Sequence, residues 1–197
     1  MEIASAALRG GADVIQLRHK SLPRGELLAL ARELRSLVDS SPFMGAAPPG
    51  GGTEGEGRAL LIINDFVDIA LLSGADGVHL GPDDLSPASA RKVAGNRLLI
   101  GVSASTAGAV PPEAGYVGCG PAFATPVKPQ KRLIGPEGVA ALAAAVSIPV
   151  FAIGGVDESN VARLVAMGVR RACVIRAVSD AADPEQATRR LRAMLTA

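Results

Sequence analysis

Three residues at the end of a short apolar run carry groups that bind anions. Gln16, Arg18 and Lys20 alternate along the chain, so their side chains share one side of an extended segment. An amide donor, a guanidinium and an ammonium together suit a phosphate or diphosphate group. A solvent-exposed strand end is the competing interpretation, although the chain has only four lysines and one of them stands here.

Acidic side chains follow the next two apolar runs. Asn64 and Asp65 follow one run, and Asp83 and Asp84 follow the other. Neighbouring parallel strands lie about 4.8 Å apart, so Asp65 and Asp84 are expected to meet at one edge of a sheet. Two carboxylates facing a phosphate-binding group predict a Mg²⁺ site. The alternative for Asn64-Asp65 and for Asp83 is a helix cap.

Three later segments add further candidates. Ser103 ends the segment Gly101-Val-Ser103 and either donates to a substrate or begins a turn. A loop stiffened by three prolines, residues 120–129, presents Thr125 and Lys128, and a rigid loop that presents a cation suits a catalytic contact.

The third segment is the turn Gly154-Gly155, between an apolar run and a helical pattern. Glycine amides beside a helix N-terminus bind phosphate. Asp157 is expected to cap the helix that follows. His79 lies inside an apolar run and is interpreted as a core histidine. No Cys/His spacing predicts a zinc site.

The elements that position these residues alternate along the chain. Short apolar runs bounded by Gly, Pro, Asn or Asp are typical of buried parallel strands. They are residues 14–17, 60–63, 77–80, 98–102, 116–119, 150–153 and 172–175. Amphipathic helical patterns stand at residues 1–9, 24–38, 67–72, 87–93, 136–146, 158–166 and 184–195. The repeated passage from a helix-ending glycine into a strand, as at Gly11-Ala-Asp13 and Gly74-Ala-Asp76, supports a series of β-α units.

This series of β-α units forms either an open sheet or a closed barrel. Candidate residues fall repeatedly just after the strands, which favours a (β/α)₈ TIM barrel with its site at the carboxyl ends of the strands. Only seven strands are counted, and the first strand is the missing one. A single domain over residues 1–197 is expected. A glycine- and proline-rich insertion at about residues 41–58 is interpreted as a flexible loop, with a lid as the alternative.

Composition limits the classes of function. The chain is 48% hydrophobic and 20% charged, with a net charge of +1, so it is globular and offers no basic field for nucleic acid. Two cysteines are too few for a disulfide framework. No apolar run approaches the roughly 18 residues of a membrane helix, and no signal peptide is recognised, so a cytoplasmic protein is expected. The oligomeric state stays open, a homo-oligomer included.

The motifs, taken in order, resemble those of thiamine phosphate synthases. They are Gln-Leu-Arg-x-Lys, Ile-Ile-Asn-Asp-x-Val-Asp-x-Ala, Gly-Ala-Asp-Gly-Val-His-Leu-Gly-x-x-Asp, Gly-Val-Ser, Gly-x-Gly-Pro-x-Phe-x-Thr-Pro-x-Lys and Ala-Ile-Gly-Gly, and they extend from about Ala6 to the C-terminus. The resemblance implies a (β/α)₈ barrel. It also implies a transferase that joins an aminopyrimidine methyl diphosphate to a thiazole phosphate and releases pyrophosphate.

The resemblance also assigns roles. It implies that the pyrimidine diphosphate is held by Gln16, Arg18, Lys20 and Asn64, and Mg²⁺ by Asp65 and Asp84. Ser103 and Lys128 would contact the pyrimidine and its leaving group, and with Arg18 they form the expected catalytic set. The thiazole phosphate would be held by Thr125, Gly154 and Gly155. Ile175 and Arg176 complete the expected substrate-binding residues.

Some positions depart from the family pattern. The usual first strand is absent, which suggests a start site placed too late or a truncated gene model. Val127 stands in place of a second threonine, and Arg176 stands in place of a serine. Three alternatives follow: a thiazole tautomerase-type relative, a degenerate non-catalytic homologue, and another phosphate-binding barrel such as an isomerase. The metal pair and the diphosphate-binding residues argue against the tautomerase.

Overall fold

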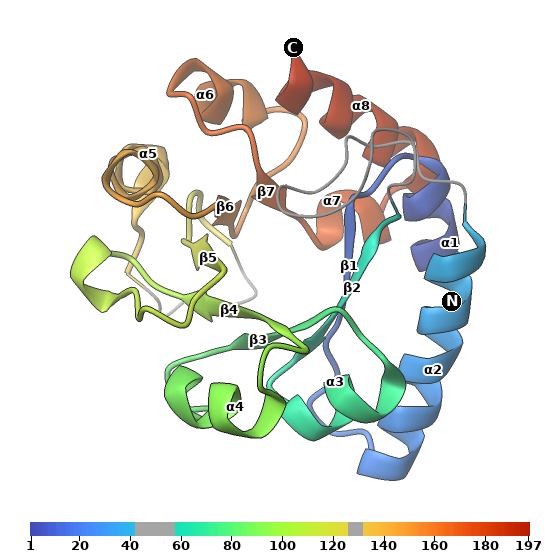
Figure 1. The fold of residues 1–197 in the computed structure, drawn as a ribbon. Helices are drawn as coiled ribbons and strands as arrows, with labels where there is room; N and C mark the ends of the chain where they lie inside the picture. The colour runs from blue at the N-terminus through green and yellow to red at the C-terminus, as the bar shows by residue number, and fades with distance from the viewer. Residues whose placement is uncertain (42–57, 126–131) are drawn as a thin grey trace.

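A parallel sheet of seven strands forms the centre of the computed structural model, which describes residues 1–41, 58–125 and 132–197. The strands lie in the sheet in chain order: β1 (Val14–Leu17), β2 (Leu60–Asn64), β3 (Gly77–Leu80), β4 (Leu99–Ser103), β5 (Tyr116–Cys119), β6 (Val150–Ile153) and β7 (Ala172–Cys173). The sheet curves around a common centre, and the helices lie outside it (Figure 1). The predicted α/β, TIM-barrel-like architecture is therefore confirmed. β7 is shorter than predicted because only Ala172 and Cys173 pair with β6, and a short helix begins at residue 176.

Most of the helices link successive strands, whereas the first precedes β1 and the last two follow β7. The helices are α1 (Glu2–Arg9), α2 (Arg24–Ser40), α3 (Val67–Ser73), α4 (Pro87–Ala94), α5 (Gly135–Ala145), α6 (Val161–Ala166), α7 (Arg176–Ser179) and α8 (Pro184–Thr196), with the 3₁₀ helix η1 at Ala107–Ala109. The sequence did not predict α7 and η1. Over the described residues, no helix has both the length and the apolar character that crossing a membrane requires.

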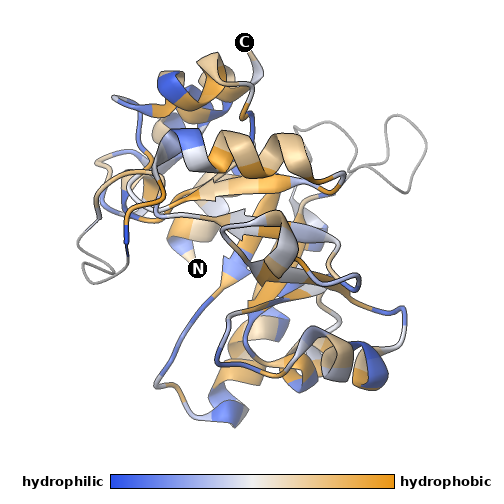
Figure 2. Ribbon diagram, turned by 90° about the vertical axis from the view of Figure 1, so that its left-hand side faces the viewer, coloured by the Kyte–Doolittle hydropathy of each residue, from blue (hydrophilic) through white to orange (hydrophobic). Residues whose placement is uncertain are grey.

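Burial against the sheet explains why these segments are helical. In α2 the buried side chains are Leu27, Ala31, Leu34 and Val38, spaced as one stripe along the helix. The strands contribute their outward-facing side chains to the same layer, including Val78 and Val117, which are fully buried. Figure 2 shows the apolar colour concentrated on the strands. The predicted insertion at about residues 41–58 lies almost entirely outside the described residues.

The helix cap predicted for Asp157 is wrong, and so is the cap considered as the alternative for Asp83. Ser86, not Asp83, caps α4 by accepting a hydrogen bond from the backbone N–H of Ser89 at 3.2 Å. The N-cap of α6 is Asn160, so that helix begins three residues later than predicted. Asp157 instead accepts the N–H of Ser159 at 2.9 Å, which closes a local turn before the helix.

The first and last helices of the chain are joined. The Arg9 Nε donates to the Glu185 Oε2 at 2.7 Å, and Arg192 pairs with Asp13 at 2.7 Å. Gly10 faces Thr188 so closely that an added Cβ would lie 2.6 Å from the threonine Cβ. These contacts join segments that are about 180 residues apart in the sequence and hold α1 against α8.

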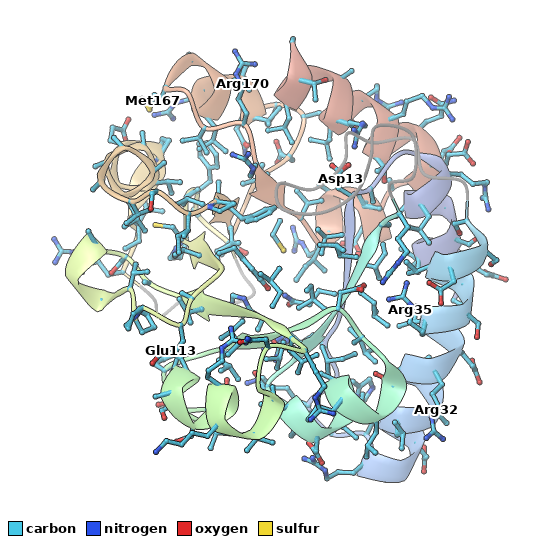
Figure 3. The ribbon with its side chains drawn as sticks, viewed as in Figure 1. Asp13, Arg32, Arg35, Glu113, Met167 and Arg170 are labelled. Atoms are coloured by element: carbon cyan, nitrogen blue, oxygen red, sulfur yellow. The ribbon has the colours of Figure 1, made fainter. Side chains whose placement is uncertain are left out.

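The second Gly-Ala-Asp repeat supplies an anchor at the amino ends of the strands. The Asp76 Oδ2 accepts from Arg35 at 2.7 Å, from Arg58 at 2.9 Å and from the backbone N–H of Leu61 at 2.8 Å. Figure 3 shows Arg35 on the side of α2 that faces the sheet. Burial raises the pKa of Asp76, but the bonds from Arg58, Leu61 and Arg35 outweigh that effect and leave the pKa below its usual value.

We expect Asp76→Asn to lower the free energy of unfolding by about 3 kcal/mol, because it leaves two arginines without a buried carboxylate. The depressed pKa means that the contribution of Asp76 is complete above the unfolded-state pKa and is lost as pH falls through the lower folded-state pKa. Urea unfolding of wild type and variant between pH 7 and pH 3 measures both effects, and the difference should shrink at the acid end.

Asp13→Asn is the matched control for this prediction, because Asp13 occupies the same position in the first repeat. Its side chain is 55% exposed and has one arginine partner, so we expect a loss below about 1 kcal/mol. Equal losses in the two variants would contradict the assignment of Asp76 as a buried anchor.

Candidate active site

The turn after β2 places Asp65 beside β3. The carbonyl of Asn64 accepts from the N–H of Phe66 at 2.9 Å, and the N–H of Asp65 donates to the carbonyl of His79 at 2.9 Å. This turn gives Asp65 a φ of 68°, the one positive φ at a non-glycine among the described residues. The left-handed conformation costs energy for a residue with a side chain, and such positions concentrate at functional sites. Neither Asn64 nor Asp65 caps α3, whose N-cap is Phe66.

Asp84 approaches from the turn after β3. The backbone N–H of Gly81 donates to the Asp84 Oδ2 at 2.7 Å, which orients the carboxylate. Burial raises the pKa of Asp65, and so do a hydrogen bond with Asp84 and the negative charge of Asp84. The positive charges of Lys20 and Arg18 act in the opposite direction. The two carboxylates therefore meet, as the sequence predicted. The positive charges of Lys20 and Arg18 are close enough to act on Asp65.

This group of charges fits a divalent cation only in part. Over the described ranges, no three His, Cys, Asp or Glu side chains are arranged to hold a metal. Two adjacent carboxylates whose repulsion raises one pKa would be relieved by a cation, and Mg²⁺ is commonly held by one or two carboxylates together with water and substrate phosphate oxygens. The residues present thus fit a Mg²⁺ ion that takes some of its ligands from these carboxylates and others from a bound diphosphate.

A chain of polar side chains crosses the space enclosed by the strands. The His79 Nε2 lies 3.0 Å from the Ser103 Oγ, and the His79 Nδ1 lies 3.1 Å from the Tyr116 hydroxyl. Tyr116 is also hydrogen-bonded to Gln16. The chain therefore links β1, β5, β3 and β4, and it joins two predicted substrate-binding residues, Gln16 and Ser103, through two residues that were not predicted to belong to the site.

Glycines make room for this chain. A Cβ added to Gly101 would lie 2.0 Å from the Tyr116 Cζ, and one added to Gly118 would lie 3.2 Å from the His79 Cε1. Gly101 is paired in register with both His79 and Tyr116. A small residue therefore faces a large one on neighbouring strands, and the polar rings fill the enclosed space.

The loops after β5 and β6 pack tightly together. The N–H of Phe123 donates to the carbonyl of Gly154 at 3.0 Å, and the Asn160 Nδ2 donates to the carbonyl of Gly155 at 2.8 Å. Gly155 has a φ of 67°, and an added Cβ would lie 2.6 Å from the carbonyl oxygen of Ala124. Only glycine fits there, so the conformation of the turn is fixed.

Comparisons with known proteins agree with one another. The sequence profile of a family described as thiamine monophosphate synthase matches residues 51–178. The thiamine-phosphate synthase of Laribacter hongkongensis is 39% identical over 98% of this chain and 86% of its own length. That of Moorella thermoacetica is 42% identical over 100% of this chain and 88% of its own length. The chain belongs to the thiamine monophosphate synthase family.

A solved structure extends this finding to the fold. The thiamine phosphate pyrophosphorylase from Pyrococcus furiosus superimposes with a TM-score of 0.84 at 34% identity, covering 99% of this chain and 88% of that one. The arrangement of strands and helices in this chain is therefore that of a member of the thiamine monophosphate synthase family.

Other residues expected from the family resemblance differ in how the structure positions them. Thr125 lies beside the glycine turn, with its Cγ2 3.6 Å from a Cβ built on Gly154. Ile175 is 57% exposed and precedes α7. Arg176 begins α7, is exposed, and has its Nε 3.8 Å from the Asp180 Oδ2. Val127 and Lys128 lie outside the described residues.

Tyr116 of this thiamine monophosphate synthase family member was not predicted to belong to the site. His79 was interpreted as a core histidine, and it is buried with a partner on each ring nitrogen. Its link to Ser103 was not foreseen. One available signal was that the only tyrosine of the chain opens β5 opposite Gly101.

Proposed function

We propose that this chain is a thiamine phosphate synthase. It condenses 4-amino-2-methyl-5-(diphosphooxymethyl)pyrimidine with thiazole phosphate and forms thiamine phosphate and pyrophosphate. The observation that carries the proposal is the pairing of Asp65 with Asp84 within range of Lys20 and Arg18, in a chain that belongs to this family. The curved sheet of seven strands over the described residues supports a (β/α)₈ TIM barrel as the fold that holds this site.

The proposed reaction breaks the bond between the pyrimidine methylene carbon and the diphosphate oxygen, and the electron pair leaves with the pyrophosphate. Arg18 and Lys20 offset the charge that develops on the leaving group, together with Lys128 from the loop after β5. Asn64 and Gln16 orient the pyrimidine diphosphate. No general base is required, because the electron-rich aminopyrimidine stabilises the methylene cation.

Asp65 and Asp84 would hold Mg²⁺, which when bound supplies positive charge to the diphosphate oxygens. The two carboxylates are costly together without a cation, as the raised pKa of Asp65 indicates. Their position beside the cationic residues sets where the diphosphate must lie, because its oxygens have to reach both.

The second substrate would bind on the opposite side of the site. The Gly154-Gly155 turn and Thr125 would hold the phosphate of the thiazole, so that the ring nitrogen faces the methylene carbon. Ser103 contacts the pyrimidine. Arg176 is exposed, and its Nε lies 3.8 Å from the Asp180 Oδ2, so we assign it only a peripheral contact with that phosphate.

The test is a condensation assay on the purified chain with both substrates and Mg²⁺, in which thiamine phosphate is detected after oxidation to its fluorescent product. We expect product that requires Mg²⁺ and disappears when EDTA is added in excess. Substrate-independent fluorescence is excluded by omitting each substrate in turn.

Failure of this assay would separate the alternatives. Binding of thiazole phosphate without condensation would favour a tautomerase-type relative. Binding of both substrates without turnover by a folded chain would favour a degenerate homologue. Either result would overturn the proposed activity.

A further inference from the structure

We propose that His79 and Tyr116 are positioning residues that fix which hydrogen-bonding groups Ser103 and Gln16 present to the pyrimidine ring. This inference rests on the proposed function and concerns how the same site recognises the aminopyrimidine. The two residues contact no substrate atom themselves. They act through the hydrogen-bonded chain that crosses the space enclosed by the strands.

The geometry of this chain leaves its members little freedom. Tyr116 is held between the ring of His79, 5.6 Å away between centroids, and the edge of Phe151, 5.5 Å away at 75°. Gly101 lies against its ring. Tyr116 and His79 are each 9% exposed, so water does not replace their partners freely.

The number of donor protons on Tyr116 and His79 links the two ends of the hydrogen-bonded chain. Burial raises the pKa of Tyr116, so the hydroxyl keeps its proton and has one donor. A neutral imidazole has one donor and one acceptor nitrogen. When His79 is neutral and Tyr116 donates to its Nδ1, the Nε2–H of that ring donates to Ser103, and the tyrosine oxygen accepts from the amide nitrogen of Gln16.

This polarity determines which hydrogen-bond donor and which acceptor face the site. The Ser103 hydroxyl is then free to donate, and the Gln16 carbonyl oxygen is free to accept. A 4-aminopyrimidine carries a ring nitrogen acceptor beside an exocyclic amino donor, which is the complementary pattern. A 4-oxopyrimidine presents an N–H donor beside a carbonyl acceptor, which is the reverse. In this polarity the hydrogen-bonded chain selects the amino form, whereas the reversed polarity would select the oxo form.

The test compares two ligands that lack the diphosphate leaving group. They are 4-amino-2-methyl-5-(phosphooxymethyl)pyrimidine and its 4-oxo counterpart, and each Kd is measured by calorimetry. We expect wild type to prefer the amino ligand. In Tyr116→Phe the ring stays but the hydroxyl is lost, so Gln16 can rotate its amide and His79 can exchange tautomers, and the preference should fall about 10-fold or more. His79→Gln, which interrupts the hydrogen-bonded chain at its middle, should give the same loss of preference for the amino ligand.

Phe151→Leu is the matched control, because Phe151 packs on Tyr116 without a hydrogen bond to it. It should lower the Tm and leave the ratio of the two Kd values unchanged. Equal weakening of both ligands in folded Tyr116→Phe and His79→Gln would show a merely structural role and overturn the inference. Turnover is measured separately: an active wild type with an unchanged Kd ratio in both variants refutes this inference alone, whereas an inactive wild type refutes the proposed function.

Discussion

Asp65→Asn is expected to reduce turnover at least about 100-fold while the fold is retained. The substitution keeps the shape of the side chain and removes its charge, so the pair with Asp84 would no longer hold a divalent cation beside the diphosphate. Asparagine tolerates the left-handed conformation that this position adopts at φ 68°, whereas alanine would add strain. The variant therefore separates loss of charge from loss of the turn.

The thermal stability of Asp65→Asn should not fall with its turnover. The pKa of Asp65 is raised in the folded protein by burial and by Asp84, so its ionised form opposes folding at neutral pH. Removing that charge should leave the Tm unchanged or raise it. Steady-state rates with saturating Mg²⁺ and thermal unfolding in its absence measure the two effects.

Asp83→Asn and Asp84→Asn provide the control for charge in this region. The two residues are neighbours, but Asp83 is exposed, and Asp84 accepts the N–H of Gly81 and meets Asp65. We expect Asp84→Asn to resemble Asp65→Asn and Asp83→Asn to resemble wild type. Activity within a few-fold of wild type in both Asp65→Asn and Asp84→Asn would remove the metal assignment.

Gly101→Ala is expected to cause the largest loss of stability, about 3 kcal/mol or more. The added Cβ would lie 2.0 Å from the Tyr116 Cζ, a distance that real contacts do not reach. The ring cannot retreat, because His79 and Phe151 pack against it. Chemical denaturation of wild type and variant gives the difference in free energy of unfolding.

Two further variants make this prediction specific. Gly25→Ala places a Cβ where no heavy atom lies within 4 Å, inside α2, so it should be neutral or stabilise by up to about 1 kcal/mol. Tyr116→Leu in the Gly101→Ala background shortens the side chain that the new methyl group meets, and it should recover part of the loss. No recovery would show that the strain lies elsewhere.

Local pattern was sufficient to predict the strands and most of the helices. Each apolar run became a strand, because burial on both faces of a parallel sheet leaves little room for polar residues. The meeting of Asp65 and Asp84 followed from the same reasoning, since the ends of adjacent strands share one edge. The roles assigned to these residues stay predictions.

The contacts of Tyr116 with Gln16 and His79 could not be predicted, because they join strands that are not neighbours in the sheet. Alternation directs Tyr116 toward the enclosed space, but its meeting with Gln16 of β1 and His79 of β3 depends on how the whole sheet curves. Asp157 and Asn160 both qualify as helix caps by residue type. Asn160 occupies the N-cap position of α6, and its Nδ2 donates to the carbonyl of Gly155 instead of its side chain capping the helix.

The order of the strands has a consequence for how the chain is made. Each strand pairs with the one synthesised just before it, so the sheet can grow one unit at a time as the polypeptide emerges from the ribosome. Helix α1 is the exception, because its partner α8 is translated after all seven of these strands. Until α8 has been made, the face of α1 that packs on it lacks that partner, so a nascent chain of this protein exposes that face to solvent.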